Sequence, residues 1–323
     1  MTDYSLSPKK AVLIAGPTAS GKSAFALELA ARHQGVIINA DSMQLYAELS
    51  VLSARPSREE EAQAPHRLYG FQPMEQPYSV ADWLIRVEAE ISAAKAQGLL
   101  PIITGGTGLY FQALTRGLAP VPDIPDDIRA AVRLQAQSEG PLAVHRALEH
   151  EDPVMAVALQ PTDSQRLIRA LEVIRATGRS LHAWQKDPAA PPVLPLDQTL
   201  PLIVMPDRAM LYQRINARFD LMIEQGGLDE ARAILAMGLD PSLPAMKALG
   251  LPQLIAHLAG KASLDEAVTT SKTVSRRYAK RQMTWFRNQM SDWVTEESGI
   301  SDELLSRVST ELKKALDGPP ARY

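Results

Sequence analysis

The sequence contains no cysteine among its 323 residues. Disulfide bonds, a thiol nucleophile and cysteine-bound zinc are therefore excluded. The longest apolar runs are well short of the ~18 residues that a membrane-spanning helix needs. The first residues, MTDYSLSPKK, lack the charged and apolar regions of a signal peptide. We therefore expect a cytoplasmic protein with no membrane partner.

An excess of charge is also absent, since 34 Lys and Arg stand against 37 Asp and Glu and give a formal net charge of −3. This balance gives no sign of a nucleic-acid partner, because proteins that bind nucleic acids are often basic. The average conceals a local contrast, however. Residues 272–287, KTVSRRYAKRQMTWFR, hold six basic residues and no acid, and the remaining 28 basic against 37 acidic residues give −9.

Short apolar runs alternate with helical patterns in the first third of the chain. Ser79 is the expected N-cap of the second helix. Buried strands that alternate with helices predict an α/β fold, in which a parallel sheet is flanked by helices on both faces. We expect strands at 11–16, 35–41 and 99–106, and helices at 22–33, 79–97 and 107–116.

Two proline-rich segments, 119–127 and 187–201, bracket a stretch with helical patterns and no clear strand. The clearest helix there begins near Thr162, which has capping-box spacing to Gln165, and stops at Gly178. A buried-strand pattern returns at 200–205, and helices dominate from 207 to 292. We predict an α/β core at 1–118 and 200–298, an all-helical insertion domain at 119–199 and a peripheral tail at 299–323.

Residues 16–23, GPTASGKS, match the G-x-x-x-x-G-K-[ST] phosphate loop between a strand and a helix. Gly16 and Gly21 let backbone N–H groups approach phosphate oxygens. Lys22 can reach terminal phosphates, and the Ser23 hydroxyl can bind Mg²⁺. The alternative is a glycine-rich turn that matches by chance, but the flanking strand and helix favour a P-loop-type sheet.

One acid expected of a P-loop nucleoside triphosphatase is missing. Such enzymes normally carry an acid after an apolar strand to hold Mg²⁺, but the candidate strand here, at 99–106, runs into Gly105 and Gly106 with no acid. The nearest acid is Asp41, which follows the second strand, where ligands bind in open α/β sheets. Asp41 is interpreted as a general base, a Mg²⁺ partner or a cap. In GGTGLY, Thr107 can donate a hydrogen bond to a ligand, or the segment is an ordinary turn.

Two arginines lie four residues apart in the segment 207–225. Arg214 and Arg218 share one helix face, and paired guanidinium groups suit a diphosphate. The alternative is a solvated face on which Asp220 and Glu224 are their partners.

The acid-free segment 272–287 is interpreted in two ways. A basic helix with the aromatic residues Tyr278, Trp285 and Phe286 suits a nucleic-acid backbone and base stacking. The alternative is a helix with an aromatic core side and a charged solvent side. The polar start of the helix near residue 165 could likewise bind RNA or face solvent.

Together these segments resemble the tRNA dimethylallyltransferase (tRNA isopentenyltransferase) family, of the bacterial type. The phosphate loop alone is shared with many families, but the combination is specific and spans roughly residues 10–290. SVLSARPS at 50–57, Arg67 and MKALGLPQL depart from the family's more usual loop residues. The matching segments are GPTASGKS, ADSMQLY at 40–46, PH at 65–66, GGTGLYF at 105–111, DSQRLIRALEV at 163–173, RINARFDLMIEQGG, and RRYAKRQMTWFR at 276–287.

The resemblance implies transfer of a dimethylallyl group from its diphosphate to N6 of adenosine-37 in a tRNA anticodon stem-loop, with Mg²⁺ as cofactor. It implies that Asp41 is the general base and that Thr18, Lys22 and Arg218 act beside it. The implied diphosphate site is Gly16, Pro17, Thr18, Ala19, Ser20, Gly21, Lys22, Ser23 and Arg218, with Ser23 on the metal. The implied tRNA contacts are Asp41, Ser42, Met43, Gln44, Thr107, Arg129, Gln165, Arg166, Leu167, Ile168, Arg169, Arg276, Arg277, Lys280 and Arg281.

Three rival functions follow from parts of the same pattern. The phosphate loop alone would permit an ATP-dependent small-molecule kinase. A prenyltransferase that uses free AMP or ATP as acceptor is the second, although the helical insert and the basic segment favour tRNA. A non-catalytic RNA-binding protein that retains the loop is the third. We expect the protein to act as a monomer.

Overall fold

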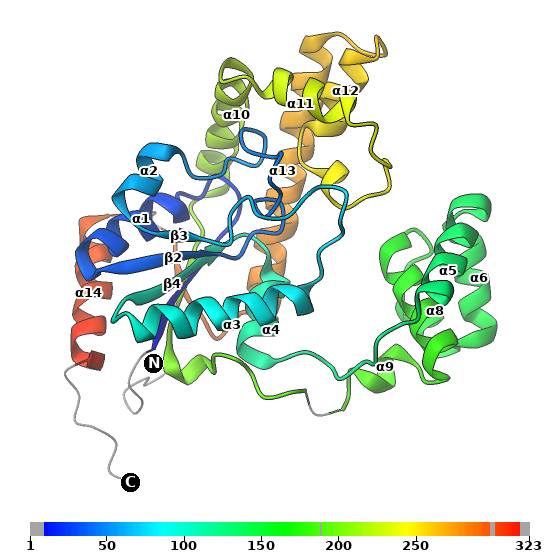
Figure 1. The fold of residues 1–323 in the computed structure, drawn as a ribbon, viewed down its shortest axis with the longest axis horizontal. Coiled ribbons are helices and arrows are strands. Elements are labelled where there is room, and N and C mark those ends of the chain that lie inside the picture. The colour runs from blue at the N-terminus through cyan, green and yellow to red at the C-terminus, as the bar shows by residue number, and fades with distance from the viewer. Residues whose placement is uncertain (1–9, 188, 298–300, 317–323) are drawn as a thin grey trace. The chain divides into compact units, whose positions relative to one another are not determined.

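A computed structural model describes residues 10–187, 189–297 and 301–316 (Figure 1). The expectations for the N-terminal segment and for part of the C-terminal tail concern residues outside these ranges. The chain divides into two compact units. The larger contains the chain up to Thr115 and from Val193 onward, and the smaller is Arg116–Pro192.

One sheet forms the centre of the larger unit. In the described residues it contains six parallel strands in the order β3-β2-β4-β1-β5-β6. This confirms the predicted parallel α/β fold. The short edge strands β3 and β6 were not predicted, because two or three residues carry no apolar pattern. The strands are β1 Ala11–Ala15, β2 Gly35–Asn39, β3 His66–Arg67, β4 Leu100–Gly105, β5 Thr199–Val204 and β6 Val294–Glu296.

Side chains alternate between the two faces of the central strands. In β1, Leu13 packs on the face that is covered by α3, α4, α10 and α13, whereas Val12 and Ile14 pack on the face covered by α1 and α14. The sheet is thus buried on both faces, as its continuous apolar runs require. These helices are α1 Lys22–His33, α3 Val80–Ala96, α4 Gly108–Arg116, α10 Arg208–Glu224, α13 Leu264–Gln289 and α14 Asp302–Leu316.

The helix caps follow local sequence signals. Ser79 and Asp82 form a capping box at the start of α3, which confirms the predicted N-cap. Shorter helices complete the larger unit, and α11 and α12 pack with the segment after β2 into a separate apolar cluster. They are α2 Arg58–Gln63, α11 Gly227–Ala236 and α12 Leu251–Leu258, with 3₁₀ turns at Leu196–Gln198 and Ala245–Lys247.

The smaller unit is built from helices around its own core, in which Val132, Val144 and Leu171 are fully buried. The predicted capping box is wrong, because α8 begins after Asp163 and no side chain caps it; Gly178 does end it in a left-handed conformation. The helices are α5 Asp126–Glu139, α6 Pro141–Glu151, α7 Pro153–Ala158, α8 Ser164–Thr177 and α9 Leu181–Trp184.

The smaller unit stops at Pro192, before the predicted insert boundary at residue 199. The physical reason is that Leu194 is 1% exposed in the core of the larger unit, and its N–H donates to the carbonyl of Leu114 at 3.1 Å. The second proline-rich segment therefore belongs partly to each unit.

The prediction of a peripheral tail is wrong for α14. Leu304, Leu305 and Leu312 of this helix are buried in the apolar cluster that α1 forms on the sheet. The His33 ring also lies 2.8 Å from the Ser309 hydroxyl. Spaced leucines on an otherwise charged helix are the signal that was overlooked. Within the described ranges, no helix has both the length and the apolarity needed to cross a membrane.

Candidate active site

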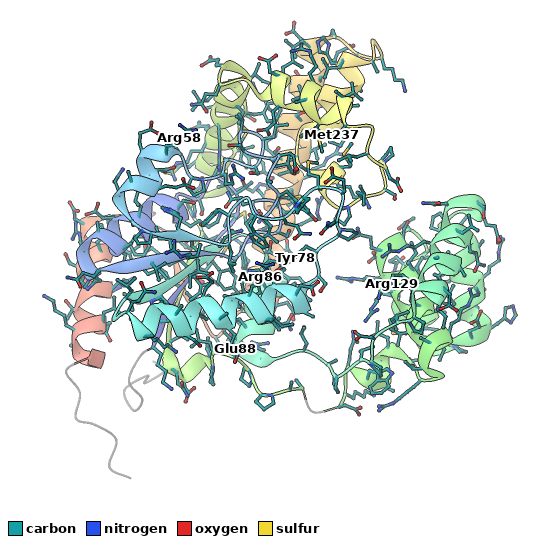
Figure 2. The ribbon with its side chains drawn as sticks, in the orientation of Figure 1. Arg58, Tyr78, Arg86, Glu88, Arg129 and Met237 are labelled. Atoms are coloured by element: carbon teal, nitrogen blue, oxygen red, sulfur yellow. The ribbon has the colours of Figure 1, made fainter. Side chains whose placement is uncertain are left out.

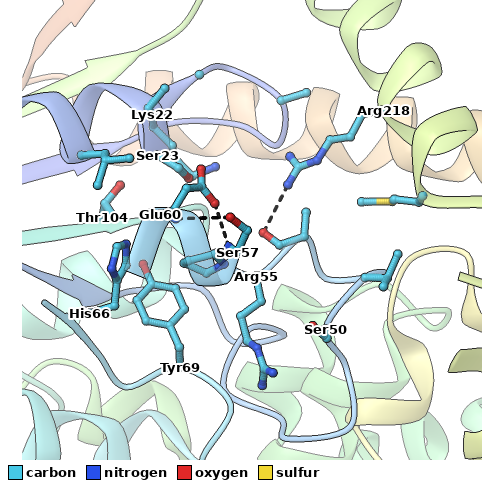
Figure 3. A pocket seen from close by; sticks show the side chains of 18 of the residues that line it. Lys22, Ser23, Ser50, Arg55, Ser57, Glu60, His66, Tyr69, Thr104 and Arg218 are labelled. Carbon is cyan, nitrogen blue, oxygen red and sulfur yellow. Dashed lines mark hydrogen bonds between the residues drawn. The ribbon is translucent and has the colours of Figure 1, made fainter. Parts of the chain in front are cut away.

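A cavity of about 890 Å³ opens in the larger unit beside the phosphate loop (Figure 3). Its walls come from the start of α1, the segment 50–57, Thr104 of β4 and one side of α10. Lys22, Arg214 and Arg218 supply cationic groups, whereas Leu27, Ile37, Tyr69, Leu221 and Met222 supply apolar or aromatic surface. The cavity therefore suits a ligand with an anionic head and a short apolar tail.

The phosphate loop joins β1 to α1, as predicted. Ala19 and Gly21 adopt positive φ angles of 63° and 97°, and such left-handed residues curve successive N–H groups around an anion. Ser20 is buried, and a Cβ on Gly16 would lie 2.7 Å from its Oγ. The start of α1 adds positive potential at the same place.

Lys22 is 9% exposed, and its Nζ donates to the carbonyl of Pro17 at 3.2 Å. The pKa of Lys22 is lowered to about 8, mainly by burial; Asp41 opposes the shift and Arg218 adds to it. The ammonium is thus cationic below about pH 8 and loses its charge as the pH rises. A bound anion would favour the charged form.

We expect the affinity for inorganic diphosphate to fall as the pH rises through about 8, because neutral Lys22 no longer attracts the anion. Calorimetric titration from pH 7 to 9.5 would measure this, with a slope approaching roughly tenfold per pH unit. Lys22→Arg keeps its charge throughout and should flatten the profile. An equal decline in that variant would contradict the assignment to Lys22.

Arg214 and Arg218 point toward the phosphate loop and the cavity. Arg214 Nη1 donates to the carbonyl of Ser20 at 3.3 Å. Arg218 Nη2 donates to the carbonyl of Ala54 at 3.4 Å (Figure 3). The pKa of Arg218 is lowered from its usual value by burial, and the nearby carboxylates of Asp41 and Glu60 offset part of this shift.

The alternative was that Arg214 and Arg218 lie on a solvated face with Asp220 and Glu224 as partners. It is wrong for Asp220, which pairs instead with Lys272 at 2.5 Å. The two arginines instead bridge α10 to the phosphate loop and to the segment 50–57. Their guanidinium groups therefore lie where an anion in the cavity would meet them.

Asp41 lies two residues after the end of β2, and its main chain is fixed by Asn39, whose Oδ1 accepts the Asp41 N–H at 2.8 Å. Asp41 Oδ1 accepts the N–H of Met43 at 3.0 Å, so one carboxylate oxygen serves the turn. The other oxygen, Oδ2, faces Gly106, where a Cβ would lie 3.2 Å from it. The cap and general-base interpretations therefore use different oxygens of one side chain.

Thr107 orders the neighbouring turn. Its N–H donates to the carbonyl of Ala40 at 3.2 Å, and its Oγ1 accepts the N–H of Ser42 at 3.0 Å. Gln44 Nε2 donates to the carbonyls of Ser53 and Ala54, so this side chain holds the segment 50–57 in place. Met43 packs partly buried against the cluster under α11 and α12.

The basic residues of α13 separate into two groups. Lys272 pairs with Asp220, and Arg276 donates to Asn216 Oδ1 at 2.6 Å, so these two tie α13 to α10. The exposed basic residues are Arg277, Lys280, Arg281 and Arg287. This second group presents its charge to solvent, whereas Lys272 and Arg276 are only partly exposed.

The predicted stacking role of the aromatic residues on α13 is wrong for Phe286, which is fully buried in the core. Trp285 packs against the backbone of Gly108, where a Cβ would lie 2.0 Å from its Nε1. Sequence reasoning missed Gln282, whose amide bonds to both site loops. It is uncharged within a basic segment, so only its helical spacing to Ala279 and Phe286 marks it as inward-facing.

The predicted RNA-contact residues of the smaller unit lie on α5 and α8. Arg129 on α5 (Figure 2) donates to the carbonyl of Ile124 at 3.2 Å. On α8, Gln165 is exposed, Arg166 lies 3.5 Å from Asp163, and Arg169 lies 3.7 Å from Glu172. Ile168 packs partly buried on the core of the unit.

Leu167 requires a correction, because it is 0% exposed in the core of the smaller unit. Its side chain therefore does not reach RNA. The predicted range continued through the apolar stripe of α8.

Metal binding would rest on few protein groups. In the described part of the chain, no cluster of three His, Cys, Asp or Glu side chains could hold a metal ion. Ser23 lines the cavity with an exposed hydroxyl at the start of α1. Mg²⁺ commonly binds through one or two protein oxygens plus substrate phosphates, so this sparse set fits a metal that arrives with a diphosphate.

Comparison with known proteins decides the family. The model of the IPP transferase family matches residues 44–289, and the isopentenyl transferase model matches residues 9–76. The chain belongs to the IPP transferase family. A Parvibaculum lavamentivorans relative named tRNA dimethylallyltransferase is 51% identical and covers 95% of this chain and 96% of its own length. A Rhodopseudomonas palustris relative of the same name is 53% identical over 88% of this chain and 90% of its own.

Solved IPP transferases share the fold. The tRNA isopentenylpyrophosphate transferase of Bacillus halodurans is 32% identical with a TM-score of 0.68, and the match covers 96% of this chain and 98% of that one. A eukaryotic dimethylallyltransferase acting on tRNA reaches a TM-score of 0.78 at 23% identity, covering 97% of this chain and 81% of that one. At that identity the likeness supports the fold alone.

Proposed function

We propose that this enzyme transfers a dimethylallyl group from dimethylallyl diphosphate to N6 of adenosine-37 in tRNA. The N6 lone pair forms a bond to C1 of the allyl group while the C1–O bond to diphosphate breaks. The N6 proton passes to a base, and diphosphate leaves. The relatives' name, tRNA dimethylallyltransferase, and membership of the family support this reaction.

The cavity beside the phosphate loop is the observation that carries the proposal. Lys22, Arg214 and Arg218 can neutralise the charge that develops on the departing diphosphate. Leu27, Leu221 and Met222 provide a surface for the hydrocarbon. Mg²⁺, held by Ser23 and the diphosphate, would supply further charge neutralisation when bound.

Asp41 is the proposed base. Its Oδ1 is engaged by Met43, and its Oδ2 faces the loop at Gly106, next to the phosphate loop. An exocyclic amine is a weak nucleophile, so a positioned carboxylate that accepts its proton assists the attack. The target adenine would have to leave its stack to reach this oxygen.

The kinase alternative lacks the acid that should follow a strand beside β1. β4 is followed by Gly106 and Thr107, and β5 is followed by Met205 and Pro206. The next residue, Asp207, caps α10, because its Oδ1 accepts the N–H groups of Ala209 and Met210. The exposed basic face of α13 favours a polyanionic acceptor over free AMP or ATP.

Incubation with dimethylallyl diphosphate, Mg²⁺ and unmodified tRNA, without ATP, tests the reaction. Nucleoside digestion of the product should yield N6-isopentenyladenosine. Free AMP or ATP in excess should not compete as acceptors. A digest without the modified nucleoside, or a requirement for ATP, would contradict the proposal.

We expect the exposed arginines and lysine of α13 to set the salt dependence of tRNA binding. The triple substitution Arg277→Ala, Lys280→Ala and Arg281→Ala should reduce the slope of log affinity against log salt by about 1 per lost phosphate contact. Filter binding between about 50 and 300 mM salt would measure this slope.

Arg276→Ala is the matched control, because its guanidinium is committed to Asn216 at 2.6 Å and to Thr273 at 2.9 Å. It should leave the slope nearly unchanged. If Arg276→Ala flattened the salt dependence as much as the triple variant does, the division of α13 into inward and outward charge would be wrong.

A further inference from the structure

A single buried side chain, Gln282, joins two loops of the candidate site. Its Oε1 accepts the N–H of Thr18 in the phosphate loop at 3.0 Å. Its Nε2 donates to the carbonyl of Gly106, directly after β4, at 2.8 Å. Gln282 is 6% exposed, and its bond to Gly106 is buried whereas its bond to Thr18 is partly buried, so leaving the amide without these partners would be costly.

The glycines of the loop after β4 are matched to this contact. A Cβ on Gly106 would lie 2.4 Å from Nε2 of Gln282, and a Cβ on Gly108 would lie 2.0 Å from Nε1 of Trp285. Gln282 and Trp285 are neighbours on one face of α13. The loop therefore approaches the helix more closely than any residue with a side chain would permit.

The two loops border different parts of the proposed site, one the diphosphate cavity and the other the proposed base. Thr18 belongs to the loop that faces the diphosphate cavity, whereas the turn after Gly106 is bonded through Thr107 to Ala40 and Ser42, on either side of Asp41. Asp41 Oδ2 itself faces Gly106. Gln282 thus links the phosphate loop directly to the Gly106 loop, which borders the proposed base Asp41.

We propose that Gln282 is a positioning residue for prenyl transfer, which holds the phosphate loop and the Gly106 loop at the separation that aligns C1 of the donor with N6 of the acceptor. This inference rests on the proposed function. It also means that α13 does two things, because its exposed face carries Arg277, Lys280 and Arg281 while its buried face fixes the phosphate loop. The helix that would bind the RNA backbone therefore also holds the donor site in register.

Gln282→Met is the principal test, because methionine has a similar length and can make neither hydrogen bond. Misplacement of reacting groups by about 1 Å can cost about 10²-fold in rate, so we expect kcat to fall about 10- to 100-fold. The dissociation constant for tRNA should stay within about twofold, since the exposed charges are retained. Gln289→Met, an exposed glutamine on the same helix, is the matched control and should behave as wild type.

Gln282→Glu separates positioning from packing. One carboxylate oxygen can still accept the Thr18 N–H, but an ionised group cannot donate to the Gly106 carbonyl and repels it. Protonation restores that donor. The ratio of the variant's kcat to the wild-type kcat, measured from pH 8.5 down to 6, should therefore rise as the pH falls, whereas a residue that only fills space would give a constant ratio.

The outcomes are distinguishable from failure of the proposed function. If wild type makes no prenylated adenosine, the proposed function itself fails. If wild type is active and a folded Gln282→Met variant keeps kcat within about twofold, the proposed positioning role of Gln282 is overturned. If Gln282→Met does not fold, a constant kcat ratio across pH in Gln282→Glu overturns the inference and a rising ratio supports it.

Discussion

Asp41→Asn should lower kcat by about 10²- to 10⁴-fold while leaving the affinity for tRNA and donor nearly unchanged. Asparagine retains an Oδ1 that can accept the Met43 N–H, now 3.0 Å away, so the turn after β2 survives. It replaces Oδ2, the oxygen that faces Gly106, with an amide that accepts no proton. Single-turnover measurement with saturating tRNA and donor isolates the chemical step from product release.

The same substitution discriminates between the two interpretations of Asp41. If the carboxylate only caps the turn, Asp41→Asn preserves the cap and should remain close to wild type. Asp41→Ala removes both functions and should lose turnover together with stability. A loss of tRNA binding in Asp41→Asn, with no activity in wild type to lose, would instead favour an RNA-binding protein without catalysis.

The phosphate loop and the strands beside it could be predicted because their signals are local. A five-residue apolar run, a glycine-rich turn and an amphipathic helix follow one another within residues 11–33, and each constrains the next. Ser79 is similar, since a capping box requires only its own residue and Asp82. Such features need no knowledge of distant segments.

The roles of individual residues on α13 could not be predicted in the same way. Arg276 and Arg277 are adjacent and chemically identical, yet Arg276 is bound to Asn216 of α10 and Arg277 is exposed. Gln282 contacts Thr18, 264 positions away in the sequence. The roles of Arg276 and Gln282 both depend on which elements pack against α13, and the composition of the segment does not indicate those neighbours.

Leu167 and Phe286 show a related error. Each lies in a segment chosen for its charged residues, and each is fully buried in an apolar core. On a helix, residues a few positions apart in a basic segment face opposite ways, so membership of the segment does not imply exposure. Helical periodicity, applied residue by residue within these segments, would have separated them.

Arg218→Ala should lower kcat/KM for the donor by about 10²- to 10³-fold, the usual cost of removing one donor that stabilises developing negative charge. The guanidinium lines the cavity and sits within electrostatic reach of Lys22 and Asp41. Among the described residues its one hydrogen bond, to the Ala54 carbonyl, is long at 3.4 Å, so the group is available to a diphosphate. Steady-state kinetics at saturating tRNA would measure the loss.

Two further variants show whether geometry or charge alone is required at this position. Arg218→Lys retains the charge but not the planar pair of donors, so it should recover only part of the activity if the diphosphate is held by two parallel hydrogen bonds. Arg214→Ala is the control on the same face of α10, because Arg214 is more exposed and its Nη1 is bonded to the Ser20 carbonyl. Its effect should be smaller than that of Arg218→Ala. Equal losses at both positions would mean that the two arginines act together as one anion clamp, and that Arg218 alone is not the group that meets the leaving diphosphate.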